Sequence, residues 1–368
     1  MARPLYQLAG ARPSLGLDGH AGLWYDKFCD KWSGQWSMSS GGSGGKDSQN
    51  PKLRWIETVT RSVGASGRLA EHATRLARLV RGSGGEFRVF STCSRFATGL
   101  GRSHPVENGF AWHPTLGTPF LPGSSVKGMV RAWAETEGEG SGSDTRLASL
   151  LGDRESGAAG TLAFMDAVPV EPVRLEADVM TPHYANWKPE DPPGDWCSPT
   201  PIPFLAMAAG AKMLFGAIPC RGASAKDAGE VMGWIAGALA WQGAGAKTAV
   251  GYGRFERDED GTGSLEQRLE KARQAQEEEQ RRAALSPVER KIEDVLANRP
   301  NMQLPASTAV FQAIGDGHWS DPADKRETIE WLKAEMERDK TWRPRSNRPQ
   351  RDKAHKRTLQ VMRWQRSE

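Results

Sequence analysis

Residues 101–131 read GRSHPVENGFAWHPTLGTPFLPGSSVKGMVR and lead from a glycine-rich turn into an amphipathic helix. Pro122 and Gly123 interrupt the preceding segment. Ser124 or Ser125 can then cap the helix, because a serine oxygen accepts hydrogen bonds from the free N–H groups of a first turn. Apolar residues follow at spacings of three and four and predict one buried face: Val126, Met129, Val130 and Trp133.

Two cations, Lys127 and Arg131, lie on the other face of this predicted helix. A helix N-terminus presents unpaired N–H groups and about half a positive charge, so a phosphate would find donors, a dipole and an ammonium group together. The segment therefore predicts contact with a phosphate or an RNA backbone. A well-capped surface helix without a ligand accounts for the same pattern.

Residues 241–255 read WQGAGAKTAVGYGRF and form a second glycine-rich segment. Its glycines and its polar side chains alternate: Gly243, Gly245, Lys247, Gly251, Tyr252, Gly253 and Arg254. Glycine lets a backbone approach a ligand closely, although a tight turn from helix to strand needs glycine only for its positive φ angles. The segment is not a P-loop, because Ala246 precedes the lysine and a helical pattern precedes the loop.

The two segments together resemble the RAMP superfamily of CRISPR effector proteins, and the second is similar to the glycine-rich loop of that superfamily. Residues 104–128, FMDAVPV at 164–170 and DVMTPHY at 178–184 resemble more narrowly the family that forms the sixth subunit of the type III-B Cmr effector complex. The motifs also occur in the same order and at similar spacing. The resemblance covers about residues 85–255 and says little about the rest of the chain.

This resemblance implies a structural, RNA-binding subunit without cofactor or metal rather than the slicing nuclease. Its partners would be the CRISPR RNA, whose 3′ portion it would help to hold, the complementary target RNA and other Cmr subunits. Backbone amides and lysine would contact phosphates, so guide binding would not depend on spacer sequence. The residues implied as RNA contacts are Ser124, Ser125, Lys127, Arg131, Gly243, Gly245, Lys247, Tyr252 and Arg254, with Arg95 and Arg102 as further candidates.

The composition of the chain is compatible with such a protein. The 368 residues exceed one average domain, and a hydrophobic share of 38% is enough for a core. The formal net charge is only +4, so a nucleic-acid site should be a local stripe. The cysteines form no CxxC pair, and no apolar run approaches the roughly 18 residues that a membrane span needs. Without a signal-peptide pattern, we expect a soluble, cytoplasmic protein.

The chain divides by composition into three predicted parts. Residues 1–84 form a tryptophan-rich N-terminal segment with a Gly/Ser linker and a helix, residues 85–258 form the RAMP core, and residues 259–368 form a charged helical extension with a basic tail. The core reads strand, helix, strand, strand pair, helix and glycine-rich strand. This order is compatible with an α+β, ferredoxin-like (RRM-like) core bearing long insertions. The strand pair is expected within residues 201–219.

The basic tail, residues 338–368, has eleven Lys and Arg against three Asp and Glu, a net charge of +8. Trp342 and Trp364 lie near its two ends. This composition suits phosphate contacts with occasional base stacking, and a flexible solubilising tail is an equally good interpretation. Our hypothesis is that the tail adds RNA affinity that does not depend on sequence.

A catalytic alternative comes from three short strings in the order found in serine acylases: SSVK at 124–127, YAN at 184–186 and KT at 247–248. In penicillin-recognising hydrolases a neighbouring lysine activates the serine, a pair that would be Ser124 and Lys127 here. Ala249 stands where the third motif has glycine, which counts against this alternative.

Histidines and aspartates of the motif segments offer a weaker catalytic hypothesis. His104, His113 and His183 could form a metal or acid–base set with Asp166 or Asp178, but they show no ligand spacing. We expect the histidines to be packing residues and the aspartates to cap or brace loops.

Overall fold

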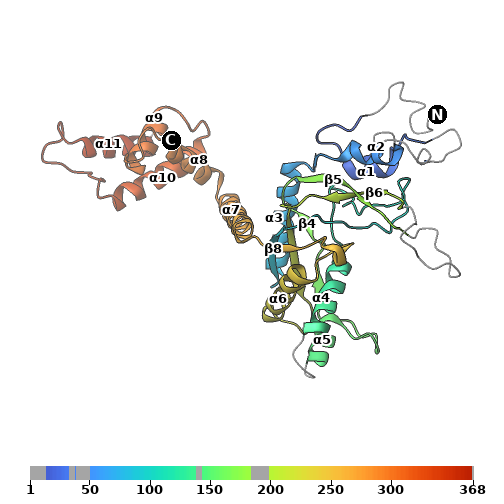
Figure 1. Cartoon of the computed structure of the whole chain (residues 1–368). Helices are drawn as coiled ribbons and strands as arrows, with labels where there is room; N and C mark the ends of the chain where they lie inside the picture. Colours follow the sequence, from blue (N-terminus) through green and yellow to red (C-terminus); the bar gives the residue numbers. More distant parts are fainter. Residues whose placement is uncertain (1–13, 33–37, 39–49, 138–142, 184–198, 367–368) are drawn as a thin grey trace, which may run out of the picture. The chain divides into compact units, whose positions relative to one another are not determined.

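The computed structural model describes residues 14–32, 38, 50–137, 143–183 and 199–366. The chain divides into two compact units, Met1–Glu270 and Lys271–Glu368. The first unit combines helices with antiparallel sheets, which confirms the predicted α+β class, and the second is helical (Figure 1). Within the described residues, no helix is both long and apolar enough to cross a membrane.

The first unit holds most of the motifs. Its helices are α1 (Ala21–Lys27), α2 (Pro51–Ile56), η3 (Glu57–Val59), α3 (Ser66–Gly82), α4 (Gly123–Glu137), α5 (Ser143–Leu151), α6 (Ala225–Trp241) and η4 (Thr248–Val250). Its strands are β1 (Ser62–Val63), β2 (Glu86–Thr92), β3 (Leu162–Phe164), β4 (Val168–Pro169), β5 (Val173–Met180), β6 (Ile202–Met207), β7 (Lys212–Pro219) and β8 (Phe255–Arg257). Helix α7 (Glu259–Ala284) begins in this unit and ends in the second.

The larger sheet has the strand order β3-β7-β2-β8, with β4 also paired to β7. All of its pairings are antiparallel, and Phe87 of β2 lies opposite Gly216 of β7. Apart from α5, η4, β4 and the second-sheet strands β5 and β6, the elements from β2 to β8 follow one another in the order β2, α4, β3, β7, α6, β8. Helices α4 and α6 therefore connect strands of one sheet and pack against each other.

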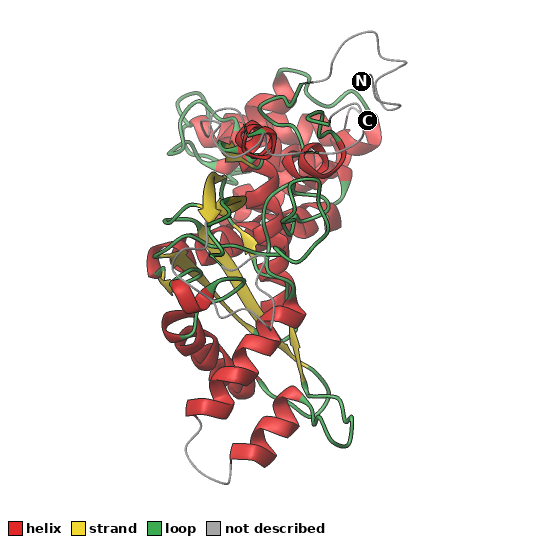
Figure 2. Cartoon of the chain, turned by 45° about the vertical axis from the view of Figure 1, so that its right-hand side comes forward, coloured by secondary structure: helices red, strands yellow, loops and turns green. Residues whose placement is uncertain are grey.

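The alternation of side chains along β2 explains why this sheet is covered on both faces. Phe87 and Val89 pack into one hydrophobic cluster with residues of α3, such as Ala77, whereas Phe90 packs with Phe215 into the cluster that contains the apolar face of α4. Figure 2 shows helices on either side of these strands. The larger sheet therefore has a hydrophobic cluster on each of its faces.

A second sheet has the order β1-β5-β6, and it corrects one expectation. The predicted strand pair within residues 201–219 is wrong in its pairing, because β6 pairs with β5 whereas β7 pairs with β2. The backbone between them is fastened to Thr92, which accepts the Gly210 N–H at 2.7 Å and donates its own N–H to Ala211 O at 2.9 Å. The chain thus passes from one sheet to the other instead of forming a hairpin.

The second unit contains α8 (Pro287–Ala297), α9 (Ala306–Gly315), α10 (Pro322–Arg338) and α11 (Lys353–Arg366) around a core of its own. Val310, Leu332 and Val361 are fully buried there. Trp342 and Trp364 pack against the same core. The interpretation of residues 338–366 as a flexible tail is therefore wrong, and neither tryptophan is an exposed platform for bases.

Candidate functional site

The first turn of α4 differs from the predicted cap. The helix begins at Gly123, whose N–H donates to Asp166 Oδ1 at 2.7 Å, and Ser125 N–H donates to Pro122 O at 2.8 Å. Ser124 and Ser125 are therefore exposed residues of the first turn rather than caps, and Asp166 has the capping role expected of it. An aspartate carboxylate thus already sits beside the positive end of the helix dipole.

Glycine is required at position 123 by close packing. A β-carbon there would lie 2.2 Å from Phe164 O, which is backbone and cannot move aside cheaply. Glycine in the L-P-G-S-S pattern therefore allows the N-terminus of α4 to pack closely against the strand β3. This packing fixes the exposed Ser124 and Ser125 relative to the sheet.

The two cations of α4 have different surroundings. Arg131 Nη2 donates to Leu151 O at 2.7 Å and to Gly152 O at 2.6 Å, and its side chain is only 12% exposed. It satisfies carbonyls that the end of α5 leaves without helical partners. Lys127 is half-buried and has no ion pair with any residue that the structure describes. Of the two, Lys127 has the free charge.

Residues 242–254 form a loop rather than a glycine-rich strand. Its backbone has positive φ at Gly243, Gly245, Gly251 and Gly253, as expected for a tight connection from α6 to β8. Ala246 N–H donates to Ala97 O at 2.7 Å and Ala244 N–H to Gly253 O at 2.8 Å. The glycines therefore allow the loop to approach itself and the segment after β2.

Lys247 and Tyr252 are held by side chains of the second sheet. Lys247 has a left-handed backbone, with φ of 63°, and its Nζ lies 5.3 Å from the ring centre of the buried Phe204. Tyr252 Oη donates to Asp178 Oδ2, which also accepts from Arg95 Nη1 at 2.7 Å. Burial alone would raise the pKa of Asp178, but the hydrogen bonds from Tyr252, Val179 N–H and Arg95 outweigh it and lower that pKa. Asp178 braces the loop, as expected of it.

The remaining predicted residues are three arginines, Arg95, Arg102 and Arg254. Arg95 also pairs with Glu176 at 3.2 Å and keeps 47% of its side chain exposed. Arg254 Nη1 donates to Ala240 O at 3.2 Å, and its N–H donates to Ser94 Oγ at 3.1 Å. Arg102 is exposed in the turn that precedes α4.

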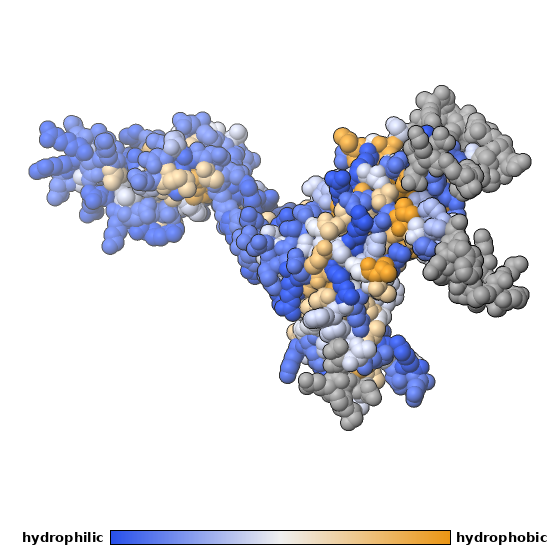
Figure 3. All heavy atoms as spheres, viewed as in Figure 1, coloured by the Kyte–Doolittle hydropathy of each residue, from blue (hydrophilic) through white to orange (hydrophobic). Residues whose placement is uncertain are grey.

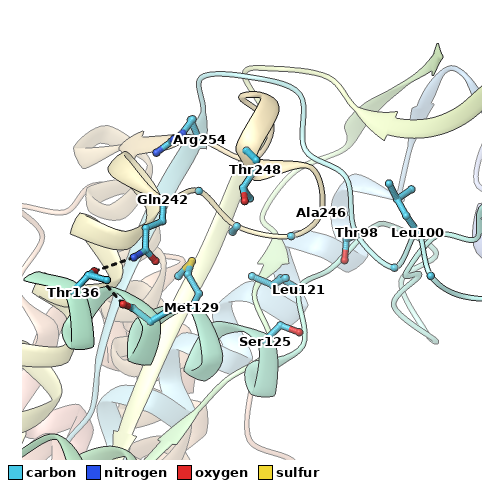
Figure 4. Close-up of a pocket in the computed structure, with 17 residues that line it drawn as sticks. Thr98, Leu100, Leu121, Ser125, Met129, Thr136, Gln242, Ala246, Thr248 and Arg254 are labelled. Atoms are coloured by element: carbon cyan, nitrogen blue, oxygen red, sulfur yellow. Dashed lines mark hydrogen bonds between the residues drawn. The ribbon is translucent and has the colours of Figure 1, made fainter. Parts of the chain in front are cut away.

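The two predicted segments meet at an open groove of about 780 Å³ (Figure 4). One wall is the face of α4 that bears Ser125, Met129 and Thr136. The other wall is the loop 242–254, here called the glycine loop. Residues 98–101 and Leu121 also line the groove. Of the residues marked as RNA contacts, the groove is lined by Ser125, Gly243, Gly245 and Arg254.

Several polar residues of the groove were missed by the sequence reasoning: Thr98, Thr136, Gln242 and Thr248. Gln242 Nε2 donates to Thr136 Oγ1 at 3.3 Å and joins the two walls at one end, as Figure 4 shows. Their only sequence signal is adjacency to the motifs. Among the described lining residues Arg254 is the only charged one, so the groove offers mainly backbone and neutral donors.

The catalytic alternatives gain no support from the geometry. Neither Ser124 nor Lys127 lines the groove, and the YAN string at 184–186 lies outside the described residues. His104 contacts Tyr25 O through Nε2 at 3.0 Å, and His113 Nδ1 accepts from Leu116 N–H at 3.3 Å. Within the described part of the chain, no group of three His, Cys, Asp or Glu side chains could hold a metal ion.

The family model described as "RAMP superfamily" matches residues 55–256, more than half of the chain, so this chain belongs to the RAMP superfamily. Two curated relatives are similar to it. The CRISPR system Cmr subunit Cmr6 of Pyrococcus furiosus is 26% identical over 228 residues, covering 45% of this chain and 66% of that protein. The CRISPR system CMR subunit Cmr6 of Saccharolobus solfataricus is 29% identical over 153 residues, covering 41% of this chain and 49% of that protein. The chain thus spans about two thirds and half of their lengths, respectively.

Solved structures are similar at a lower level. One chain of a type III-B Cmr-beta complex bound to cognate target RNA has a TM-score of 0.48 and 20% identity, with 69% of this chain and 94% of that chain covered. The crystal structure of Cmr6 from Pyrococcus furiosus has a TM-score of 0.34 and 24% identity, with 47% and 97% covered.

Proposed function

We propose that this RAMP protein is a non-catalytic, RNA-binding structural subunit of a type III-B CRISPR (Cmr) ribonucleoprotein in the cytoplasm. It helps to hold the 3′ part of the CRISPR RNA and its duplex with target RNA, next to other Cmr subunits. The observation that carries the proposal is the groove, where two segments more than a hundred residues apart in sequence converge. The names of the curated relatives support the assignment to a Cmr complex.

The larger sheet supports a ferredoxin-like (RRM-like) core in this proposal. The chain order β2, α4, β3, β7, α6, β8 is a βαββαβ sequence, and the spatial order β3-β7-β2-β8 places the first and third strands of that sequence in the centre. The core corresponds to residues 85–258, preceded by the segment 1–84 and followed by the charged extension 259–368. The groove lies where α4 and the loop before the last strand meet.

The mode of RNA binding follows from the chemistry of the groove walls and of the residues beside them. Backbone groups of the glycine loop and the hydroxyls of Ser124 and Ser125 contact phosphate and ribose, whereas Lys247 and Arg254 supply charge. None of these groups reads a base edge in a defined way. Binding is therefore independent of spacer sequence, and its affinity falls as salt rises. Tyr252, Arg95 and Arg102 extend the contact surface beyond the groove.

The decisive experiment is purification of the tagged protein from its native host at moderate salt. Sequencing of the bound RNA should give short RNAs with a uniform, repeat-derived 5′ end, and mass spectrometry should identify other RAMP subunits. A monomer without RNA would contradict the proposal. It would justify testing the serine-acylase hypothesis by labelling Ser124 with a β-lactam probe.

A charge-reversal pair tests the loop 242–254, which forms one wall of the groove. Lys247→Glu with Arg254→Glu should weaken binding of single-stranded RNA by roughly tenfold or more, because phosphate contacts dominate affinity. The matched control reverses Arg221 and Lys226, two exposed cations near the other end of α6. Equal losses in both variants would show that only net charge matters and would remove the groove from the proposal.

A further inference from the structure

The helical second unit lies outside the part of the chain that the RAMP family model matches. It has its own core and its own capping box, in which Ser286 Oγ accepts the Glu289 N–H at 3.1 Å and Glu289 Oε2 accepts the Ser286 N–H at 2.7 Å. The face of this unit that is visible in Figure 3 is largely hydrophilic. The RNA contacts proposed for the groove lie in the first unit, so they assign no role to the second unit.

The loop before α11 and the first turn of that helix carry exposed cations, and these are here called the basic face. Its members are Arg345, Arg348, Arg351, Lys353 and Lys356. The segment 343–356 reads RPRSNRPQRDKAHK and contains no large apolar residue. All of its large side chains are thus charged or polar.

The loop of the basic face is fixed to α11 at two places. Arg343 N–H donates to Thr358 Oγ1 at 2.9 Å, and its carbonyl oxygen lies 2.8 Å from Nδ1 of the buried His355. Asp352 accepts from Ser346 Oγ at 3.0 Å and from the N–H groups of Ala354 and His355 at 3.0 and 3.1 Å. The cations therefore project from a preorganised backbone, which lowers the entropy lost on binding.

The charges of the basic face also lack partners. None of its five cations has an ion pair with any described residue, whereas elsewhere in the unit Arg281 pairs with Glu293 at 2.6 Å and Arg282 pairs with Asp294. Asp352 caps α11 and pairs with Arg343 at 3.4 Å, so it does not neutralise the others. An external polyanion would remove this concentration of like charge.

We propose that the basic face binds the phosphate backbone of single-stranded RNA, as a second contact outside the RAMP core. Three of its five cations are arginines, whose planar guanidinium groups bind phosphate oxygens in pairs. The segment lacks the apolar or aromatic anchors that are common in protein interfaces and in interfacial helices, so RNA phosphates are the occupant proposed here. The inference rests on the proposed function only for its choice of RNA as the polyanion.

The test measures binding of a fluorescein-labelled, mixed-sequence, single-stranded RNA to the full chain by anisotropy between 50 and 300 mM salt. The basic-face variant changes Arg345, Arg348, Arg351 and Lys356 to Gln. We expect at least tenfold weaker binding and a salt slope smaller by about 2 to 3, since each lost phosphate contact removes about 0.7. The control variant changes Lys271, Arg326, Lys340 and Arg366 to Gln, an equal loss of exposed charge. Its binding should stay within about twofold of the parent protein.

Each other outcome has a definite meaning. Absence of RNA binding by the parent chain at 50 mM salt, or equal losses in the two glutamine variants, overturns the inference. An unchanged basic-face variant beside a weakened Lys247/Arg254 variant overturns the inference and leaves the proposed function intact. The reverse pattern supports the basic face and removes the groove assignment. If the basic-face variant binds RNA normally but no longer co-purifies with its complex, the face binds an acidic protein and the inference fails.

Discussion

At the scale of single residues, three partly buried histidines of the first unit couple its stability to pH. Burial lowers the pKa of His104, and the carbonyl of Tyr25 and the carboxylate of Asp26 only partly offset this effect. Burial also lowers the pKa of His72 and of His113, whose rings pack edge to face at 5.2 Å. The folded chain therefore holds these imidazoles neutral at pH values where an unfolded chain protonates them.

The first prediction is a loss of stability on mild acidification. Because the unfolded histidines titrate near pH 6.5 and the folded ones titrate lower, the unfolded state binds more protons between these values. The free energy of unfolding should be fully retained above about pH 7 and should fall as pH drops through 6.5 towards 5. Urea unfolding at several pH values measures it. A His104→Gln, His113→Gln variant should show a shallower dependence, and an identical slope would contradict the assignment.

At the scale of the element, the N-terminus of α4 is occupied by the carboxylate of Asp166, which competes with any phosphate for the same dipole. Asp166→Asn keeps a side-chain oxygen that can accept the Gly123 N–H, but it removes the negative charge. We predict that RNA affinity rises by roughly two- to fivefold, the size of a helix-dipole interaction of about 0.3–1 kcal/mol. Glu155→Gln, an exposed charge change beyond α5, is the matched control in the same anisotropy assay. A fall in affinity for Asp166→Asn would show that the carboxylate is needed to shape the site.

The glycine loop makes a prediction about stability at the same scale. A β-carbon at Gly253 would lie 1.9 Å from Ala244 O, whereas one at Gly251 would meet nothing within 4 Å although φ is +93°. Gly251→Ala should cost about 1–2 kcal/mol from backbone conformation alone. Gly253→Ala should cost more, because a backbone clash adds to a similar conformational cost. Chemical denaturation of the two variants compares them directly, and equal costs would mean that the loop relaxes around residue 253.

At the scale of the whole molecule, the two units have separate cores. We predict that the fragment 271–368 folds alone into a helical unit with a cooperative thermal transition, because its buried residues contact one another. Circular dichroism and tryptophan fluorescence of the fragment measure this, with Leu332→Ala as a core-disrupting control. A fragment that is helical but melts without cooperativity would contradict independent folding. The same core argues against testing the basic tail by deletion of the residues after Arg338, since that deletion would remove the buried Val361.

Local patterns in the sequence predicted which segments form helices better than they predicted which residues those segments contact. The predicted helix with the apolar spacing (α4) and the predicted helix before the second glycine-rich segment (α6) are confirmed, and the two motif segments meet at one groove. The hydrogen bond by which Asp166 caps α4 joins residues that are 43 positions apart in the sequence. The hydrogen bond from Arg131 to the end of α5 joins residues that are 20 positions apart. The split of β6 and β7 between two sheets depends likewise on Thr92. No periodicity encodes such contacts, because they are set by tertiary packing.

The basic tail, residues 338–368, also shows that tertiary contacts could not be predicted from the sequence. Its composition suggested exposed tryptophans, but charge counts do not show which face of a helix a neighbour covers. The ring centres of Phe311 and Trp364 lie 5.1 Å apart, and Lys333 Nζ lies 5.6 Å from the ring centre of Trp342. Both tryptophan rings therefore belong to the packed unit. The cations of the basic face could be counted from the sequence, whereas their fixed backbone could not.

Five residues of the glycine loop have positive φ angles: Gly243, Gly245, Lys247, Gly251 and Gly253. This region of backbone conformation is the one that D-amino acids prefer. A D-alanine introduced at Gly251 by chemical ligation would adopt φ of +93° without strain, and it would restrict the unfolded chain more than glycine does. The D-enantiomer should therefore stabilise the protein where the L-enantiomer destabilises it. The stereochemistry of a single methyl group would then tune the rigidity of the glycine loop without altering its charge.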